Sequence, residues 1–319
     1  MTKQYPLVSV LIITFNRSNS LDTILNKLFS QDYKNLDVIV IDNASTDDTE
    51  GLIKQKYPQI TFIKSPSNIG IQAFNIGLRI VRGDYLLLLD DDSYPLENTI
   101  LTGVNLFKEK KDVGIVAYEV LNEKLNFIET RNIPKNNTTY FFGGGALIRK
   151  SIVTEVGFYD ELIFMYNNEV DLSIRVLEKG YKILYLPDCR VIHMPSEVTD
   201  RNSLVDLYKS EFRYYHVTVG HFIFLTKHFS IRWVVIYSLK WILNRIIIAI
   251  RFKLVKTFFK ALFRFAKIFH KVVASRKVVS KEIQKLYNYG KIPIVDRDFY
   301  PNFEKKKIMS NALKLFRVH

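Results

Sequence analysis

The feature that most constrains the fold is a run of four leucines that ends in three aspartates, at residues 85–93 (YLLLLDDDS). A short run that is apolar throughout is typical of a strand buried on both faces inside a parallel sheet. The carboxylates cannot continue into the core, because burying unpaired carboxylates is costly. Ligands of open α/β sheets bind beyond the carboxyl ends of the strands, so Asp90, Asp91 and Asp92 form a candidate metal and phosphate site. The alternative is a solvated acidic turn that caps the following helix.

The first half of the chain alternates between strand-like and helix-like patterns, which predicts a parallel sheet with helices on both faces. The expected strands are residues 7–14, 36–41, 60–64 and 86–89, and the expected helices are residues 19–30, 46–57 and 71–81. In such a sheet the polar groups that follow three of the strands, at residues 14–17, 42–45 and 90–92, converge on one crevice. No glycine-rich phosphate loop follows the first strand, which argues against a dinucleotide cofactor and against an ATPase.

Asp42 has two interpretations. It could accept a hydrogen bond from a ribose hydroxyl or a base N–H, or it could cap the helix that begins near residue 46. Its neighbours Asn43, Ser45 and Asp47 are equally able to cap that helix. This redundancy favours a ligand role for Asp42.

The middle of the chain, residues 112–195, is less regular. Strands are expected at residues 113–118 and 182–186, and residues 139–148 (TYFFGGGALI) suggest a strand, a glycine hinge and a second strand. The three glycines either let the backbone approach a ligand closely or form an ordinary β-bulge. His193 follows the last of these strands, in a position where a single histidine is usually structural.

A helix is expected at residues 169–179, because Val170, Ile174 and Leu177 lie on one stripe. Glu169 and Asp171 fall in its first turn, where the helix dipole stabilises carboxylates. That stabilising role is the simplest explanation for either acid taken alone.

Six segments, in this order, resemble the family 2 glycosyltransferases, which are inverting enzymes with nucleotide-sugar donors. The segments are VSVLIITFNR (8–17), VIDNASTDDT (40–49), SNIGIQAFNIG (67–77), LLLLDDD (86–92), GGGALIRK (143–150) and GFYDELIFMYNNEVDLSIR (157–175). They are most similar to the branch of rhamnosyl- and galactofuranosyl-type enzymes of bacterial surface polysaccharides. The resemblance covers residues 5 to about 195.

The resemblance implies an α/β fold of the Rossmann-like GT-A type, with a mixed, mainly parallel sheet, and Mg²⁺ or Mn²⁺ as cofactor. It also implies a nucleotide-sugar donor and a saccharide or lipid-linked acceptor. The implied donor-binding residues are Thr14, Asn16, Arg17, Asp42, Asn68, Gly70, Asn75, Asp90 and Asp91. Asp92 and His193 are the implied metal ligands, and Gly144 and Gly145 are expected to contact the acceptor.

An inverting transfer needs a carboxylate that takes a proton from the attacking hydroxyl. Similar proteins carry Glu-Asp immediately before V-D-L, and the aspartate is the proposed base. This chain has Asn168 and Glu169 at those positions, so it departs from the pattern. Glu169 keeps the carboxylate on a longer side chain and is the expected base, with Asp171 as the alternative.

The basic charge of the chain is concentrated near its C-terminus. The net charge is +14, yet residues 212–281 contain fifteen Lys and Arg and no Asp or Glu, which leaves 31 basic and 32 acidic residues elsewhere. We therefore expect a catalytic domain at residues 1–200 and a basic amphipathic helical region at residues 201–319 that associates with an anionic membrane surface.

The expected membrane association is based on two predicted helices of this region. Residues 231–250 are apolar enough to suggest a membrane span, but Lys240 and Arg245 near the centre favour a helix that lies in the interface. In the next helix a cationic side faces away from an apolar side. The cationic side consists of Lys253, Lys256, Lys260, Arg264, Lys267 and Lys271, and the apolar side of Phe258, Leu262, Phe265 and Phe269. Nucleic acid is disfavoured as the polyanion by the aromatic side, and the remaining alternative is a surface helix packed on the catalytic domain.

The first residues lack the apolar core of a signal peptide, and Cys189 is the single cysteine, so no intrachain disulfide is possible. We therefore expect a peripheral protein at the cytoplasmic face of the cell membrane. Two other functions compete with a glycosyltransferase. A sugar-phosphate nucleotidyltransferase would need a glycine-rich basic loop after the first strand, which FNRSNS does not provide. A catalytically degenerate membrane scaffold is suggested by Asn168.

Overall fold

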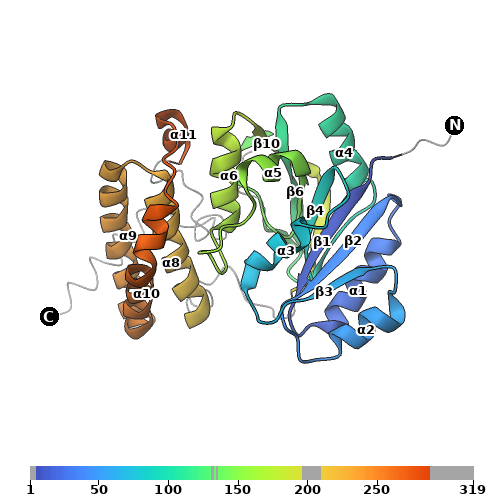
Figure 1. Ribbon diagram of the computed structural model, residues 1–319, viewed down its shortest axis with the longest axis horizontal. Coiled ribbons are helices and arrows are strands. Elements are labelled where there is room, and N and C mark those ends of the chain that lie inside the picture. Colours follow the sequence, from blue (N-terminus) through green and yellow to red (C-terminus); the bar gives the residue numbers. More distant parts are fainter. Residues whose placement is uncertain (1–4, 131–132, 134–135, 196–209, 288–319) are drawn as a thin grey trace.

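The computed structural model describes residues 5–130, 133, 136–195 and 210–287. Within these residues the chain forms one ten-stranded sheet, covered by helices on both faces, and a separate layer of helices beside it (Figure 1). The strand order is β3 (Thr61–Lys64), β2 (Leu36–Asp42), β1 (Val8–Thr14), β4 (Tyr85–Asp90), β9 (Ala146–Arg149), β6 (Val113–Asn122), β10 (Lys182–His193) and β5 (Ser93–Pro95). The short strands β7 (Phe127–Ile128) and β8 (Asn136–Thr138) pair with β6 and β10.

The sheet is mixed and mainly parallel, as the resemblance to the family 2 glycosyltransferases implies. Strands β1, β2, β3 and β4 are parallel, while β9 runs antiparallel between β4 and β6. In the register, Thr14 lies opposite Asp42 and Ile13 lies opposite Asp90. The polar ends of β1, β2 and β4 therefore reach the same edge of the sheet.

Strand β4 is buried on both faces, which explains its continuous run of leucines. Leu87 and Leu89 belong to the core beneath α1 (Ser18–Phe29), α2 (Thr49–Lys56) and α4 (Thr99–Glu109). Leu86 and Leu88 belong to the core on the other face. That face is covered by a 3-10 turn (Gly70–Ala73), α3 (Phe74–Leu78), α5 (Lys150–Val156) and α6 (Asn168–Glu178). Each buried leucine contributes about 1.5–3 kcal/mol to folding.

Three expected elements differ from the observed ones. The helix predicted at residues 71–81 is a 3-10 turn followed by the short α3, and within residues 139–148 only β9 is a strand. The strand predicted at residues 182–186 continues to His193, with a register irregularity after Leu186. That continuation carries His193 to the same sheet edge as the aspartates, since His193 pairs with Ser93 of β5.

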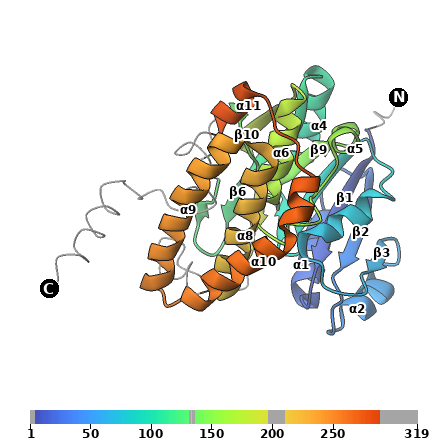
Figure 2. The ribbon, with the colours of Figure 1, turned by 60° about the vertical axis from the view of Figure 1, so that its left-hand side comes forward.

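The helical layer consists of α8 (Glu211–His228), α9 (Ile231–Arg251), α10 (Val255–Ala274) and α11 (Lys281–Leu286). Helix α8 lies beside α6, and α9 lies on the side of α8 that is remote from the sheet (Figures 1 and 2). Phe224 and Leu225 of α8 share a buried cluster with Val170 and Ile174 of α6. The layer is thus joined to the sheet through the helix that begins with Asn168.

The apolar side predicted for α10 is only partly right as a lipid-facing surface. Phe258 is buried and packs with Ala249 of α9, while Leu262 and Phe265 are partly buried within the helical layer. Phe269 is exposed. The protein itself therefore occupies most of this side of α10, because three adjacent helices need a shared apolar core.

Candidate functional site

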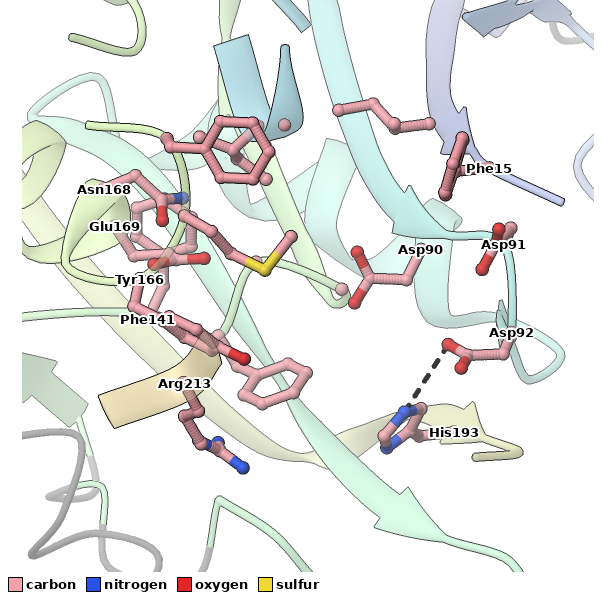
Figure 3. Close-up of a pocket in the computed structure, with 18 of the residues that line it drawn as sticks. Phe15, Asp90, Asp91, Asp92, Phe141, Tyr166, Asn168, Glu169, His193 and Arg213 are labelled. Atoms are coloured by element: carbon pink, nitrogen blue, oxygen red, sulfur yellow. Dashed lines mark ion pairs between the residues drawn. The ribbon is translucent and has the colours of Figure 1, made fainter. Parts of the chain in front are cut away.

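A cavity of about 610 Å³ lies at the edge of the sheet where β1 and β4 end. Its wall includes Thr14, Phe15 and Arg17 at the end of β1, and Asp90, Asp91 and Asp92 at the end of β4. Figure 3 shows Asp90 near the middle of this cavity, with Asp92 and His193 on one side and Glu169 on the other. The predicted convergence of strand ends produces this crevice.

Arg17 partly balances the charge of the aspartate triplet. Its Nη1 lies 2.6 Å from Asp92 Oδ2 and 3.1 Å from Asp91 Oδ1. Burial raises the pKa of Asp90 to about 7, helped by the charge of Asp92, and burial raises the pKa of Asp91 to about 6 despite Arg17. Burial acts in the same sense on Asp92, but His193 and Arg17 outweigh it and lower its pKa. Asp92 is therefore the member of the triplet that stays ionised most readily.

His193 links Asp92 to a second buried acid. Its Nε2 lies 3.4 Å from Asp92 Oδ1, and its Nδ1 lies 3.0 Å from Glu129 Oε1. Glu129 Oε1 also accepts a hydrogen bond from Asn122 Nδ2 at 2.8 Å. Burial lowers the pKa of His193, but its bonds to Asp92 and Glu129 prevail and raise that pKa to about 9.

Asp92 and His193 fit a divalent cation. Asp92 Oδ1 and His193 Nε2 are close enough to share one ion, which would replace the proton on Nε2, and a carboxylate and a neutral imidazole are both suitable ligands for Mn²⁺. Among the described residues no group of three His, Cys, Asp or Glu side chains forms a complete metal cage. Mg²⁺ sites commonly use one or two carboxylates and take further ligands from substrate phosphates, so a cation at this pair would need phosphate oxygens to complete its coordination.

Glu169 occupies the opposite wall of the cavity, in the first turn of α6. The two residues before α6, Tyr166 and Asn167, both have left-handed backbone conformations, with φ of 65° and 61°. Such geometry is costly for residues other than glycine and is often found at functional sites. Burial raises the pKa of Glu169 to about 7, although its own backbone N–H and Asn168 act in the other direction.

The glycine run allows both acids to lie against the backbone. A β-carbon on Gly143 would overlap with Oε1 of Glu169, and one on Gly144 would lie 2.5 Å from Oδ2 of Asp90. Gly145 instead faces Val120 and Val191 in the core and does not line the cavity. The expected contact of Gly145 with an acceptor is therefore not supported by its position.

Most of the residues implied by the resemblance do meet in the cavity. They are Thr14, Arg17, Asn68, Gly70, Asp90, Asp91, Asp92, Gly144, Glu169 and His193. Asn43, which follows Asp42, lines the cavity as well. Its side chain holds the 68–70 turn through bonds to Gly70 O and from Ile69 N.

Four other residues lie outside the cavity wall. Asn16 accepts a hydrogen bond from Thr46 N at 2.7 Å, and Asn75 exchanges two hydrogen bonds with the backbone of Tyr159. Asp42 is fully buried and accepts from Ser45 N at 2.9 Å. These three polar side chains satisfy backbone groups in turns, which is how they are expected to behave where turns pack tightly.

Asp171 is the fourth of these residues, and the structure keeps it away from the cavity. Its Oδ1 lies 2.7 Å from His228 Nε2, and its Oδ2 lies 2.7 Å from Arg175 Nη2. Burial raises the pKa of Asp171, but Arg175 and His228 outweigh burial and hold it well below its ordinary value. A carboxylate that is held by a guanidinium on one oxygen and by a buried imidazole on the other is poorly suited to take a proton from a substrate.

The sequence did not point to several residues of the wall. Glu129 belongs to the pair with His193, and Phe212 and Arg213 come from the first turn of α8. Tyr140, Phe141, Phe142, Phe164 and Tyr166 line the cavity as well. Tyr140, Phe141 and Phe142, which precede the glycine run, were a usable signal, because ligand pockets are lined mainly by apolar and aromatic side chains.

The model of "Glycosyl transferase family 2" matches residues 9–170. An uncharacterized glycosyltransferase of Rickettsia typhi is 26% identical over 188 residues, which is 54% of this chain and 59% of that protein. The Escherichia coli UDP-Glc:alpha-D-GlcNAc-diphosphoundecaprenol beta-1,3-glucosyltransferase WfaP is 34% identical over 107 residues, or 33% of this chain and 43% of that protein. The matches thus span about half the length of these two relatives.

Solved structures share the fold over nearly the whole chain. A mannosyltransferase from Pyrobaculum calidifontis, in complex with GDP-Man and Mn²⁺, has a TM-score of 0.55 and 18% identity, and covers 93% of this chain and 83% of its own. Residues 1–349 of Staphylococcus aureus TarS give a TM-score of 0.53 at 17% identity, covering 92% and 89%. These neighbours identify the sheet as GT-A type. With its family model matched over half of its length, the chain belongs to glycosyl transferase family 2.

Proposed function

We propose that the protein is an inverting glycosyltransferase that moves a sugar from a nucleoside-diphosphate donor to a hydroxyl group of an acceptor. The observation that carries the proposal is the arrangement of Glu169 and the Asp92–His193 pair on opposite walls of one cavity, with Asp90 between them (Figure 3). A donor whose diphosphate lies at Asp92 would present its anomeric carbon to an acceptor activated by Glu169.

The donor end of the cavity has groups suited to a nucleoside diphosphate. Thr14, Arg17 and Asn68 line it. Asp42 lies behind this wall, and its Oδ2 is buried without a hydrogen-bond partner among the described residues, 4.0 Å from Lys64 Nζ. An unsatisfied buried carboxylate oxygen is costly, so a donor group such as a base N–H would be favoured there. We therefore assign Asp42 to the nucleoside of the donor, which could reach its Oδ2 after a small movement of the wall.

The metal site belongs to the same end. Asp92 and His193 would hold Mg²⁺ or Mn²⁺, which supplies positive charge for the leaving diphosphate. Glu129 accepts from His193 Nδ1 and so fixes the orientation of the ring with Nε2 directed at Asp92. Arg17 holds the other oxygen of Asp92 and adds a permanent positive charge beside the diphosphate position.

Glu169 is the proposed general base. Its raised pKa, about 7, makes its carboxylate basic enough to accept a proton near neutral pH. The acceptor oxygen loses that proton to Glu169, forms a bond to the anomeric carbon from the face opposite the diphosphate, and the bond to the diphosphate oxygen breaks. Attack from the opposite face inverts the anomeric configuration. The nearby aromatic wall would pack against the apolar faces of sugar rings.

The acceptor is proposed to be a saccharide carried on a lipid, in the synthesis of a cell-surface polysaccharide. Relatives support this class by their names. WfaP acts on a GlcNAc-diphosphoundecaprenol, and an Erwinia amylovora protein that is 25% identical over 202 residues, 56% of this chain and 66% of that protein, is an amylovoran biosynthesis glycosyltransferase. Phe212 and Arg213 place an aromatic ring and a cation at the α8 side of the cavity, where a phosphorylated lipid carrier could be accommodated.

The experiment is release of nucleoside diphosphate from a panel of nucleotide sugars, with Mn²⁺ and a polyprenyl-diphosphate-linked sugar. We expect turnover with one donor, and an approximately 10²- to 10⁴-fold loss in Glu169→Gln with unchanged nucleotide affinity. Glu109→Gln, at an exposed acid of α4, is the matched control. Wild-type activity in Glu169→Gln would contradict the assigned base. Absence of release with every donor would instead favour a catalytically inactive scaffold.

A further inference from the structure

Helix α9 carries an apolar side on the outside of the protein. Four side chains spaced four residues apart are exposed, with exposed fractions of 53%, 58%, 63% and 44%: Val235, Leu239, Leu243 and Ile247. The buried side of the same helix is formed by Tyr237, Trp241, Arg245 and Ala249. A surface helix of a soluble protein normally has the opposite arrangement, with its apolar side turned inward.

The exposed and buried rows lie on opposite sides of α9 along its length. Each exposed residue precedes a buried one by two positions, which corresponds to about 200° around the helix axis. The buried row faces the other helices of the layer, since Trp241 packs with Val217 of α8 and Ala249 packs with Phe258 of α10. The apolar row is therefore directed away from the protein, and contiguous exposed apolar surface of this kind marks an interaction site.

Helix α10 extends this surface. Phe258 and Leu262 pack against α9, and the residues that follow each of them, Phe259 and Phe263, have exposed fractions of 58% and 73%. One residue corresponds to about 100° of rotation, so Phe259 and Phe263 lie on the outer flank of α10 that borders α9. The exposed basic residues lie further around the helix, at about 180–240° from Phe258: Lys260, Arg264, Lys267 and Lys271.

The positive charge around this apolar surface favours an anionic binding partner. Residues 212–281 contain fifteen basic and no acidic side chains. An apolar surface bordered only by cations matches a bilayer of anionic lipids, whose acyl chains and phosphates offer both complements. A second copy of the chain is a poorer complement, because two such surfaces would bring like charges together.

We propose that α9 and α10 form a membrane-docking face, on which α9 lies in the plane of an anionic bilayer. The docking face consists of Val235, Leu239, Leu243, Ile247, Phe259 and Phe263, with Lys260, Arg264, Lys267 and Lys271 on lipid phosphates. The α9 helix has the length and composition of a membrane span. Its other side, however, is packed on α8 and α10, so one side alone is open to lipid.

The docking face is joined to the cavity through α8. Helix α8 contacts α9 and α10 by one side, and its first turn supplies Phe212 and Arg213 to the cavity wall. A protein held by the docking face would therefore keep its cavity at a fixed height above the bilayer. The docking inference does not depend on the proposed reaction, and vesicle binding tests it without any turnover.

The test is co-sedimentation of the full chain with vesicles of phosphatidylcholine, alone or mixed with phosphatidylglycerol. We expect wild type to bind the mixed vesicles, and Leu239→Gln/Leu243→Gln to bind about tenfold or more weakly, because two apolar side chains leave the lipid. The matched control is Ile80→Gln/Leu96→Gln, which changes two exposed apolar residues of the catalytic domain, 42% and 38% exposed, and should bind as wild type does.

The charge contribution is tested separately. Lys260→Gln/Lys267→Gln should weaken binding to the vesicles that contain phosphatidylglycerol, but not to those of phosphatidylcholine, and should make the binding less dependent on salt. Lys108→Gln/Lys111→Gln, on the catalytic domain, should have neither effect. Alkaline carbonate should release the bound wild type. The inference is overturned if Leu239→Gln/Leu243→Gln binds vesicles as well as wild type does, or if wild type stays on the vesicles in carbonate. It is also overturned if wild type is a dimer and the Leu239→Gln/Leu243→Gln protein is a monomer with unchanged vesicle binding. Melting temperatures would verify that each variant is folded.

Discussion

Glu169 Oε1 occupies the space that a β-carbon on Gly143 would need. The two residues are brought together from the glycine run before β9 and from the first turn of α6. A side chain at residue 143 would therefore displace the carboxylate of the proposed base from its observed position.

The Gly143→Ala variant should lose activity without losing its fold. The new methyl group would displace the Glu169 carboxylate, and a shift of about 1 Å in a reacting group is sufficient for a roughly 10²-fold loss in kcat. The affinity for nucleotide, at the other end of the cavity, should stay unchanged. Steady-state kinetics together with nucleotide titration would measure both quantities.

A second substitution provides the control. In Gly143→Ala/Glu169→Asp the shorter side chain makes room for the methyl group, so this double variant should be more active than Gly143→Ala alone. A double variant that is less active than either single variant would show that Gly143 acts in some way other than by contact with Glu169.

Activity should rise with pH through about 7. Burial raises the pKa of Glu169 from 4.5 to about 7, and the base acts only when it is deprotonated. We therefore expect kcat/KM to increase below this pH and to level off above it. In Glu169→Gln the residual activity should lack this rise, which a pH–rate profile would detect.

The same pKa shift predicts that the folded protein becomes less stable as pH rises, whereas its activity increases. The folded protein favours the protonated acid, so the stability that Glu169 contributes at low pH is lost as pH rises through the folded pKa of about 7. Glu169→Gln keeps a neutral side chain and avoids this loss. Its melting temperature should exceed that of wild type at pH 8 and match it at pH 4, below the unfolded pKa of 4.5; a variant that is less stable at pH 8 would contradict the buried position.

Glu129 should control metal affinity through His193. It accepts from His193 Nδ1 at 3.0 Å, and removal of such an outer carboxylate commonly weakens metal binding about 10- to 100-fold. Calorimetric titration of Glu129→Gln with Mn²⁺ and a nucleoside diphosphate would measure the change, and chelation followed by Mn²⁺ addition would test metal dependence of turnover. Glu119→Gln is matched in burial, 5% against 4% exposed, but Glu119 pairs with Arg190 outside the cavity. An equal loss of Mn²⁺ affinity in Glu129→Gln and Glu119→Gln would instead indicate a general loss of protein stability.

The sequence was informative where a pattern is local. The leucines of β4 alternate between two cores, so their continuous run predicted a doubly buried strand, and the acids after it could only end at the sheet edge. Glu129 was not predictable in this way, because it pairs with a residue that is 64 positions further along the chain, His193. Phe212 and Arg213 reach the cavity through the packing of α8 on α6, which no local pattern records.

Helix α10 shows a different limit. Its periodicity predicted a helix with cationic and apolar sides, and both are present. The helix has phenylalanines on a buried side and on an exposed side, Phe258 and Phe259 for example. Hydropathy alone cannot show which of these sides contacts protein, because the contact depends on where the apolar sides of α8 and α9 lie.

Asp171 is predicted to stabilise the fold and not to act as a base. It joins α6 to α8 through His228 at 2.7 Å, and it pairs with Arg175, which also donates to the carbonyls of Val156 and Gly157. Removing one partner of a buried ion pair typically costs about 3–5 kcal/mol, because the other charge stays buried. Asp171→Asn should therefore lower the free energy of unfolding by a similar amount in urea denaturation. Measured well below its melting temperature, the variant should keep the kcat/KM rise near pH 7 that Glu169→Gln loses. A variant of wild-type stability without that rise would transfer the role of base to Asp171.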